Sequence, residues 1–420
     1  MEKNEQILKE GSFRKMVMNL CVPTIVIMLV MVLYNMADTY FIGKTGDPCK
    51  IAAVSLCGLI FSILSGLGTL LGSGGCTAVS LAFGKKEFDK IRAYSSMCCY
   101  GALTMGLIFT GAVLINAPAI SDAIGANADT MSDTCTYLRI LAIGGPVILF
   151  GNVFNNLIRA DGSAKQSMLA NGLGTYLLWY IAQKNRIFSL HIKDFSLKRE
   201  IVFPVVTLGF PMACSTILMS ISHMVMNQML AGYGSVAVAA NGVAGKVSMV
   251  VSMTAMGICM GMQPAISYNC GAGNYKRLYW IIKKLGIMTV VVGSILTAGC
   301  VVGKTYLVAA FIDHAQVIEL GEKMVAVSMV IGPFYGLYQL CTTFLQSTGK
   351  ASYATLVAVL NKGLIYLPLL LIFNNLWGLN GVIYTAPVTD MLSLLVGAGL
   401  CIRWNRIMVN GDRGLSLSDV

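Results

Sequence analysis

A single acidic residue, Asp38, stands inside the first apolar segment of the chain. Between Lys15 and Lys44 it is the only charged side chain. A carboxylate at the depth of the bilayer centre costs about 2.5–3.5 kcal/mol on insertion scales, so it usually faces a partner group or a water-filled cavity. Helix capping or packing is the plain alternative. We favour a site at which a transporter binds an ion or a proton.

Two polar neighbours share a helical face with this acid. Asn35 and Tyr34 precede Asp38 by three and four residues, the spacings at which side chains of one helix meet. Because the carboxylate cannot hold an ion and a cationic compound at once, alternate occupancy would couple the movement of one to that of the other. We therefore predict a cation-coupling site at Asp38, Tyr34 and Asn35. The coupling ion is H⁺ or Na⁺; the only metal suggested is Na⁺ at Asp38, and no cofactor is expected.

A second set of polar and aromatic side chains recurs in both halves of the chain. Three amides with helical spacing in the fourth apolar segment correspond, by a constant shift in residue number, to Gln339, Thr342 and Thr343 in the second half. Two tyrosines beside Gln339 could stack on aromatic cations. Interhelical hydrogen bonds for the amides and plain packing for the tyrosines are the alternatives. The predicted substrate cleft is lined by Asn152, Asn155, Asn156, Tyr335, Tyr338 and Gln339.

The elements that must position these residues are membrane helices. Of the 420 residues, 56% are hydrophobic and 12% charged, with a mean hydropathy of +0.72; a soluble domain is about 25% charged. A transmembrane β-barrel is excluded because its strands alternate apolar and polar residues. Several charge-free runs reach the roughly 18–20 residues that span a bilayer as a helix: 51–84, 93–121, 140–158, 201–245, 247–275, 285–303 and 324–349.

The charged connections predict an orientation, because lysine and arginine are enriched in cytoplasmic loops. The basic connections include 85–92 and 184–199, and the acidic ones are 122–133 and 313–322. Both termini are therefore expected in the cytoplasm, in a multi-pass protein of the cell membrane. The net charge of +11 fits this orientation, and a nucleic-acid partner is not expected.

The two halves of the chain repeat each other. Gly84, Gly145-Pro146 and Gly162 correspond to Gly271, Gly332-Pro333 and Gly349, and the shift in residue number is the same in all three cases. The expected organisation is a cytoplasmic lead (1–15), an N-terminal lobe (16–183), a linker (184–200), a C-terminal lobe (201–403) and a tail (404–420).

The first lobe is shorter than the second. The interval from Gly162 to Lys184 is less than half of the corresponding interval from Gly349 to Arg403. The deficit is about 32 residues, which at 1.5 Å per residue is roughly one membrane crossing. We expect four complete spans in the first lobe, followed by a re-entrant or interfacial remnant over 166–183 or a gap after Thr175.

These motifs resemble the multidrug and toxic compound extrusion (MATE) family of antiporters. The matching residues are Asn35-x-x-Asp38-x-x-Phe41-Ile42-Gly43, Gly84…Phe88 and Arg159-Ala160-Asp161-Gly162, within a resemblance that covers about 15–403. The resemblance implies an all-α polytopic membrane protein with two homologous helical bundles around a central cleft. In this 6+6 architecture the deficit would fall in the first bundle. The implied activity is export of cationic, aromatic compounds in exchange for H⁺ or Na⁺.

The resemblance also implies residue roles. In the branch that this chain resembles most, the cation site uses the helix-one acid and a tyrosine one turn earlier, which map to Asp38 and Tyr34. An Asn and an Asp of helix five complete that site, and they would fall in the stretch missing after Thr175. Another branch has an acid in helix seven, where this chain has Met219 and Ser220.

Other functions stay open. A lipid-linked sugar flippase of the same superfamily would line its cleft with arginines, and arginines are absent from the charge-free segments. The shortened lobe could leave a transport-impaired variant. A membrane enzyme is disfavoured because the spans show no catalytic or metal-ligand cluster. Asp390 and Lys246 also lie deep in spans, and their pairing is conceivable although no spacing supports it. The expected partners are small organic cations and the lipid bilayer, with the protein a monomer.

Overall fold

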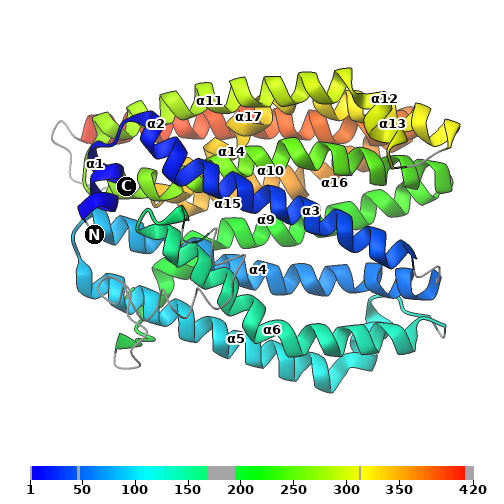
Figure 1. The fold of residues 1–420 in the computed structure, drawn as a ribbon, viewed down its shortest axis with the longest axis horizontal. Helices are drawn as coiled ribbons and strands as arrows, with labels where there is room; N and C mark the ends of the chain where they lie inside the picture. The colour runs from blue at the N-terminus through cyan, green and yellow to red at the C-terminus, as the bar shows by residue number, and fades with distance from the viewer. Residues whose placement is uncertain are drawn as a thin grey trace.

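The computed structural model describes residues 2–44, 48–127, 129–165, 167, 194–311 and 314–411. Every long element in these ranges is a helix, and the long helices run side by side along the longest axis of the molecule (Figure 1). In the first half they are α1 (Glu2–Glu10), α2 (Phe13–Met16), the π-helix η1 (Val17–Cys21), α3 (Val22–Lys44), α4 (Pro48–Gly84), α5 (Phe88–Ala123) and α6 (Met131–Ala160).

The second half continues the same arrangement. Its helices are α9 (Arg199–Ala231), α10 (Ser235–Gly271), α11 (Tyr275–Val302), α12 (Lys304–Ala309), α13 (Ala315–Met329), α14 (Gly332–Ser347), α15 (Ala351–Val359), the π-helix η3 (Leu360–Leu364), α16 (Tyr366–Trp377) and α17 (Leu379–Gly411).

Membrane-spanning helices dominate the described residues. Nine are long and apolar enough to cross a bilayer, and the bent pair α13 and α14, with an angle of 49° between its members, brings the number to as many as ten. Four of these spans precede residue 165, and the others begin at residue 199 or later. The predicted polytopic α-helical class is confirmed. The predicted remnant over 166–183 lies outside the described residues apart from Ser167, and the domain boundaries stay a prediction.

The repeat is visible in the backbone. The turns that follow α4 and α10 each contain one residue in the left-handed region, Lys86 (φ 61°) and Gly273 (φ 69°), which are equivalent positions of the repeat. Gly162 and Gly349, which follow α6 and α14, pair in the same way with φ 86° and 84°. Lys86 adopts a conformation that a side chain with a Cβ atom rarely takes. The shared turn geometry confirms that the two lobes are homologous bundles.

The lobes are joined along one half of their length. One apolar core cluster contains residues of both lobes, such as Leu71 and Val153 of the first and Val205 and Leu345 of the second. Two further clusters each belong to a single lobe: one around Val243 and Leu370, the other around Cys57 and Leu138. The lobes therefore share one apolar core toward one end and have separate apolar cores toward the other.

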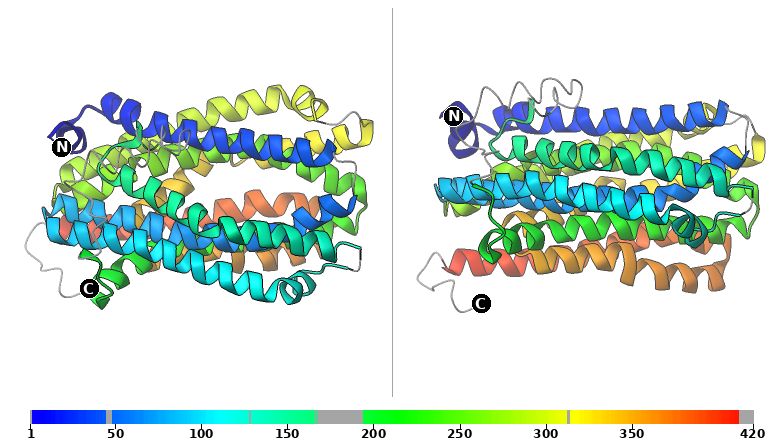
Figure 2. Two further views of the ribbon diagram at one scale, coloured as in Figure 1. Left: turned by 60° about the horizontal axis from the view of Figure 1, so that its bottom comes forward. Right: turned by 90° about the horizontal axis from the view of Figure 1, so that it is seen from below.

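The joined end carries both α1 and the end of α17, as Figure 2 shows; we call it the α1 end. The predicted lead differs from a simple tail because it folds as α1 and buries Leu8 completely. The backbone oxygen of Leu8 accepts a hydrogen bond of 3.0 Å from Asn269 of α10. The guanidinium of Arg277 donates to the oxygen of Gly11. Leu8 also packs on Gly162, so α1 bridges the two lobes.

Candidate functional site

The first predicted site lies on α3. The backbone is helical from Val22 to Lys44, so Tyr34, Asn35 and Asp38 occupy one face of a continuous helix. The side chain of Tyr34 is 71% exposed. The side chains of Asn35 and Asp38 lie outside the described part of the structure, and their contacts stay a prediction.

The three amides predicted for the cleft differ in their exposure to solvent. Asn152 is exposed, whereas Asn156 is buried and donates to the backbone oxygen of Asn152 at 2.7 Å. The Oδ1 atom of Asn156 accepts a hydrogen bond from the buried guanidinium of Arg159. The backbone oxygen of Asn155 accepts one from Ser167 at 3.2 Å. Asn156 therefore serves the internal packing of the first lobe, while Asn152 presents a polar surface.

Arg159 is a buried cation near the last turn of α6. It is 5% exposed, and it belongs to the motif Arg159-Ala160-Asp161-Gly162 at the end of the fourth span, which we call the box. In the same box the carboxylate of Asp161 accepts a hydrogen bond of 3.0 Å from the backbone of Ser163. The residues of the box therefore form hydrogen bonds that stabilise the end of α6 and the turn that follows it.

The residues predicted from the second lobe come together on α14. The rings of Tyr335 and Tyr338 lie 5.8 Å apart with their planes tilted. Tyr338 is buried, whereas Tyr335 and Gln339 are half-buried. The half-buried ring of Tyr335 therefore provides an aromatic surface, whereas the ring of Tyr338 is 3% exposed and belongs to the core cluster that both lobes share.

An ion pair that the sequence did not reveal lies next to this aromatic surface. The Nζ atom of Lys362 in η3 is 3.8 Å from Oδ1 of Asp390 in α17. The suggested pairing of Asp390 with Lys246 is wrong. The Nζ atom of Lys246 instead lies over the ring of Phe311, 5.8 Å from its centroid. Both lysines thus find a partner that lowers the cost of a charge inside a membrane protein.

Polar side chains also hold the two lobes together toward the α1 end. Gln263 of α10 donates to Thr77 of α4 at 2.8 Å. Gln346 of α14 donates to Ser73 of α4 at 2.7 Å and to the backbone oxygen of Leu208 at 2.6 Å. Both glutamines are buried, so these hydrogen bonds belong to the packed interface between the lobes.

Metal chemistry of the usual clustered kind is not supported by the described residues. No group of three or more His, Cys, Asp or Glu side chains among them could hold a metal ion. What the geometry offers instead is an aromatic surface, amides on helix faces and an ion pair. These are groups that bind organic compounds reversibly.

Comparison with known proteins gives a consistent result over the whole chain. The family model described as MatE matches residues 23–182 and again residues 211–372, one match in each lobe. The multidrug export protein MepA of Staphylococcus saprophyticus is 29% identical over 433 residues, covering 94% of this chain and 95% of that protein. MepA of Staphylococcus aureus strain NCTC 8325 is 29% identical over 434 residues with the same coverage.

Solved structures share the fold. An outward-facing multidrug resistance MATE family transporter of the MOP superfamily superposes with a TM-score of 0.88 at 20% identity, covering 98% of this chain and 99% of that one. A MOP superfamily transporter from Pyrococcus furiosus, described as having a binding pocket of reverse polarity, superposes with a TM-score of 0.87 at 20% identity and the same coverage. The two-lobe architecture predicted from the repeat is that of these structures.

Proposed function

The chain belongs to the MatE family of membrane transporters, and we propose that it exports small organic cations in exchange for H⁺ or Na⁺. The related staphylococcal proteins are named multidrug export proteins, which supports a transporter of several compounds. The predicted partners are aromatic cations and the lipid bilayer. The predicted location is the cell membrane, with both termini in the cytoplasm.

One observation carries the proposal: the lobes share a core at the α1 end and have separate cores at the other end. An alternating-access transporter needs two bundles that can rock about a shared interface. The hydrogen bonds from Gln263 and Gln346 to α4 lie in that interface. The compound would bind between the lobes, at the exposed amide of Asn152 and the ring of Tyr335.

Asp38 is the proposed coupling residue. Its position on one face of α3 with Tyr34 and Asn35 supports this role, because these neighbours can hydrogen-bond the carboxylate or an ion on it. Binding of H⁺ or Na⁺ would displace the organic cation at one side of the membrane. Loss of the ion at the other side would restore the site.

The proposal is tested with the purified full-length chain in liposomes that hold ethidium as the probe. An imposed inward proton or sodium gradient is expected to drive ethidium movement in the opposite direction, and the gradient that succeeds identifies the ion. Ethidium flux that is equal with and without either gradient would contradict antiport.

A transport-impaired variant is the second candidate, because the first lobe is short. The alignment to the Staphylococcus saprophyticus protein runs over 433 positions, more than the 420 residues of this chain, so part of that protein faces gaps here. The same liposome assay decides between the two candidates. In the impaired case ethidium binds the purified protein but does not move under either gradient.

A further inference from the structure

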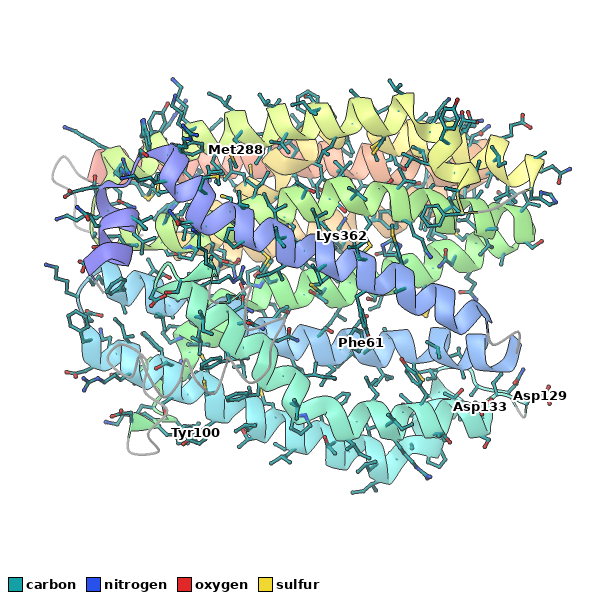
Figure 3. All side chains as sticks on the ribbon, in the orientation of Figure 1. Phe61, Tyr100, Asp129, Asp133, Met288 and Lys362 are labelled. Carbon is teal, nitrogen blue, oxygen red and sulfur yellow. The ribbon has the colours of Figure 1, made fainter. Side chains whose placement is uncertain are left out.

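A half-buried ion pair joins two candidate membrane spans of the second lobe. Lys362 and Asp390 approach to 3.8 Å, and their side chains keep 20% and 14% of their surface exposed. Figure 3 places Lys362 near the middle of the axis along which the long helices run. Charges cost most at this depth, so a charged residue here is by default a candidate for function.

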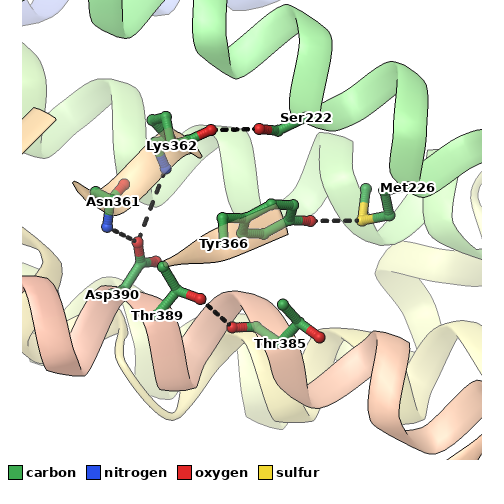
Figure 4. Close-up of polar contacts among 8 residues, drawn as sticks. All are labelled: Ser222, Met226, Asn361, Lys362, Tyr366, Thr385, Thr389 and Asp390. Carbon is green, nitrogen blue, oxygen red and sulfur yellow. Dashed lines mark hydrogen bonds and ion pairs between the residues drawn. The ribbon is translucent and has the colours of Figure 1, made fainter. Parts of the chain in front are cut away.

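The local backbone and its hydrogen bonds position the two charged side chains. Lys362 and Asn361 lie in the π-helical turn η3, a distortion that often accompanies functional sites. Asn361 donates to Oδ1 of Asp390 at 2.8 Å, and Ser222 of α9 donates to the backbone oxygen of Lys362 (Figure 4). Three helical segments thus fix the pair: η3, α9 and α17.

Polar groups at the ion pair can still form further hydrogen bonds. The distance of 3.8 Å exceeds the roughly 2.7–3.2 Å of a good hydrogen bond from nitrogen to oxygen. The buried Oδ1 atom of Asn361 has no hydrogen-bond partner among the described residues. A donor from a bound molecule would satisfy this acceptor, and an incoming carboxylate would give the ammonium of Lys362 a closer partner.

The two opposite charges favour a ligand that carries both a positive and a negative group. A simple organic cation would be attracted by Asp390 and repelled by Lys362 at almost the same distance, and an anion would meet the reverse. A compound with both charges side by side can lie antiparallel to the pair and gain at both positions. The site therefore differs from Asp38, which has no charged neighbour within its apolar segment.

Two tyrosines of α14 lie beside the ion pair. Tyr335 lies close to both charged residues and is half-buried, and its ring centroid is 5.8 Å from that of Tyr338. Aromatic side chains beside a few placed polar groups are the usual components of a small-molecule site.

A purely structural role explains the pair less well. Burying two charges costs more than their attraction returns unless the geometry is excellent, and apolar residues of similar size often stabilise a protein more. The long contact and the unpaired amide oxygen show that this geometry is not optimised for pairing.

We propose that Lys362 and Asp390 bind the zwitterionic head group of transported compounds. Lys362 receives the carboxylate, Asp390 receives a neighbouring ammonium group, and the half-buried ring of Tyr335 contacts an aromatic body. The inference rests on the proposed export function and adds a second substrate class to it, net-neutral compounds with adjacent ammonium and carboxylate groups.

The test uses two fluorescent probes, Nε-dansyl-lysine and dansylcadaverine. They share the fluorophore and the carbon chain, but only dansyl-lysine has a carboxylate beside its ammonium. Their affinities for the purified full-length protein are measured by fluorescence titration for the wild type, Lys362→Met, Asp390→Asn and the double variant. Lys246→Met serves as the matched control, because it removes another lysine of the same lobe.

We expect Lys362→Met to weaken binding of dansyl-lysine by at least about tenfold, the effect of losing one hydrogen bond to a charged group. Binding of dansylcadaverine is expected to stay the same or become tighter, since a repelling charge has gone. The double variant should bind dansyl-lysine as weakly as Lys362→Met. Lys246→Met should bind both probes as the wild type does.

Equal affinity for dansyl-lysine in the wild type, Lys362→Met and the double variant would overturn the proposal, as would a wild type that does not bind dansyl-lysine. If a single variant loses both probes, its unpaired charge has disturbed the fold, and the neutral double variant then decides. Failure of gradient-driven ethidium export with intact selective binding of dansyl-lysine would count against antiport and leave this site standing.

Discussion

Gly84 and Gly271 occupy equivalent positions in the two repeats and pack reciprocally across the lobe interface. A Cβ atom on Gly84 would lie 2.2 Å from the backbone oxygen of Tyr268, and one on Gly271 would lie 2.2 Å from that of Leu81. Leu81 and Tyr268 are themselves equivalent positions of the repeat. The contact is thus nearly self-complementary, as at the two-fold interface of a dimer.

Adding a methyl group at either glycine should disturb this contact. We expect Gly84→Ala and Gly271→Ala each to destabilise the protein by about 1–3 kcal/mol, the usual cost of overpacking. The measurement is the melting temperature of the purified protein in detergent. Because the contact is reciprocal, the two variants should shift it by similar amounts.

Two glycines of the same helices provide the controls. A Cβ atom on Gly58 of α4 or Gly242 of α10 would meet nothing within 4 Å. Alanine is the better helix former, so Gly58→Ala and Gly242→Ala should leave the melting temperature unchanged or raise it. A loss at these positions equal to that at Gly84 would contradict the reciprocal contact.

The docking of α1 should depend on Leu8. This side chain is fully buried and touches Gly162, so Leu8→Ala is expected to cost about 2–5 kcal/mol of the docking free energy. Limited proteolysis with trypsin reports release of α1 through cleavage after Lys9. Lys9→Ala would remove that cleavage site, so the control is Gln6→Ala at an exposed position of α1, which should leave the rate of cleavage nearly unchanged. Equal rates for Leu8→Ala and the wild type would show that α1 is not held by this contact.

Substitutions at two glutamines of α14 should have different effects, one on stability and the other on substrate binding. Gln346 is buried and donates to both Ser73 and Leu208, so Gln346→Met should cost about 1–3 kcal/mol for two hydrogen bonds. Gln339 is half-buried and belongs to the predicted cleft, so Gln339→Met should change ethidium affinity with little effect on the melting temperature. A lower melting temperature with unchanged ethidium affinity for Gln339→Met would show that Gln339 does not line the cleft.

Much of the fold could be predicted from the sequence, because a bilayer allows few structures. Long charge-free runs can satisfy their backbone polar groups only as helices there, and the constant shift in residue number between matching motifs identified the two lobes. The positive φ angles at Gly162 and Gly349 are the conformational reason why glycine recurs at these equivalent positions.

The ion pair was missed because hydropathy does not report which spans are neighbours. Lys362 stands sixteen residues before the turn at Gly378, and Asp390 stands twelve after it. Two antiparallel helices joined at that turn bring the residues to similar depths, and this spacing was the signal available in the sequence. The side chains of Asn35 and Asp38 lie outside the described structure, as does most of 166–193, so the coupling site remains a proposal.

The central claim is that Asp38 couples ion entry to export, and Asp38→Asn tests it most directly. Asparagine has almost the same size but cannot take up a proton or carry a charge. Ethidium movement driven by the effective gradient is measured in liposomes for the wild type, Asp38→Asn and the control Asp122→Asn, an exposed acid near the end of α5. The account predicts that Asp38→Asn abolishes gradient-driven movement while Asp122→Asn matches the wild type. Gradient-driven movement at the wild-type rate in Asp38→Asn would contradict it.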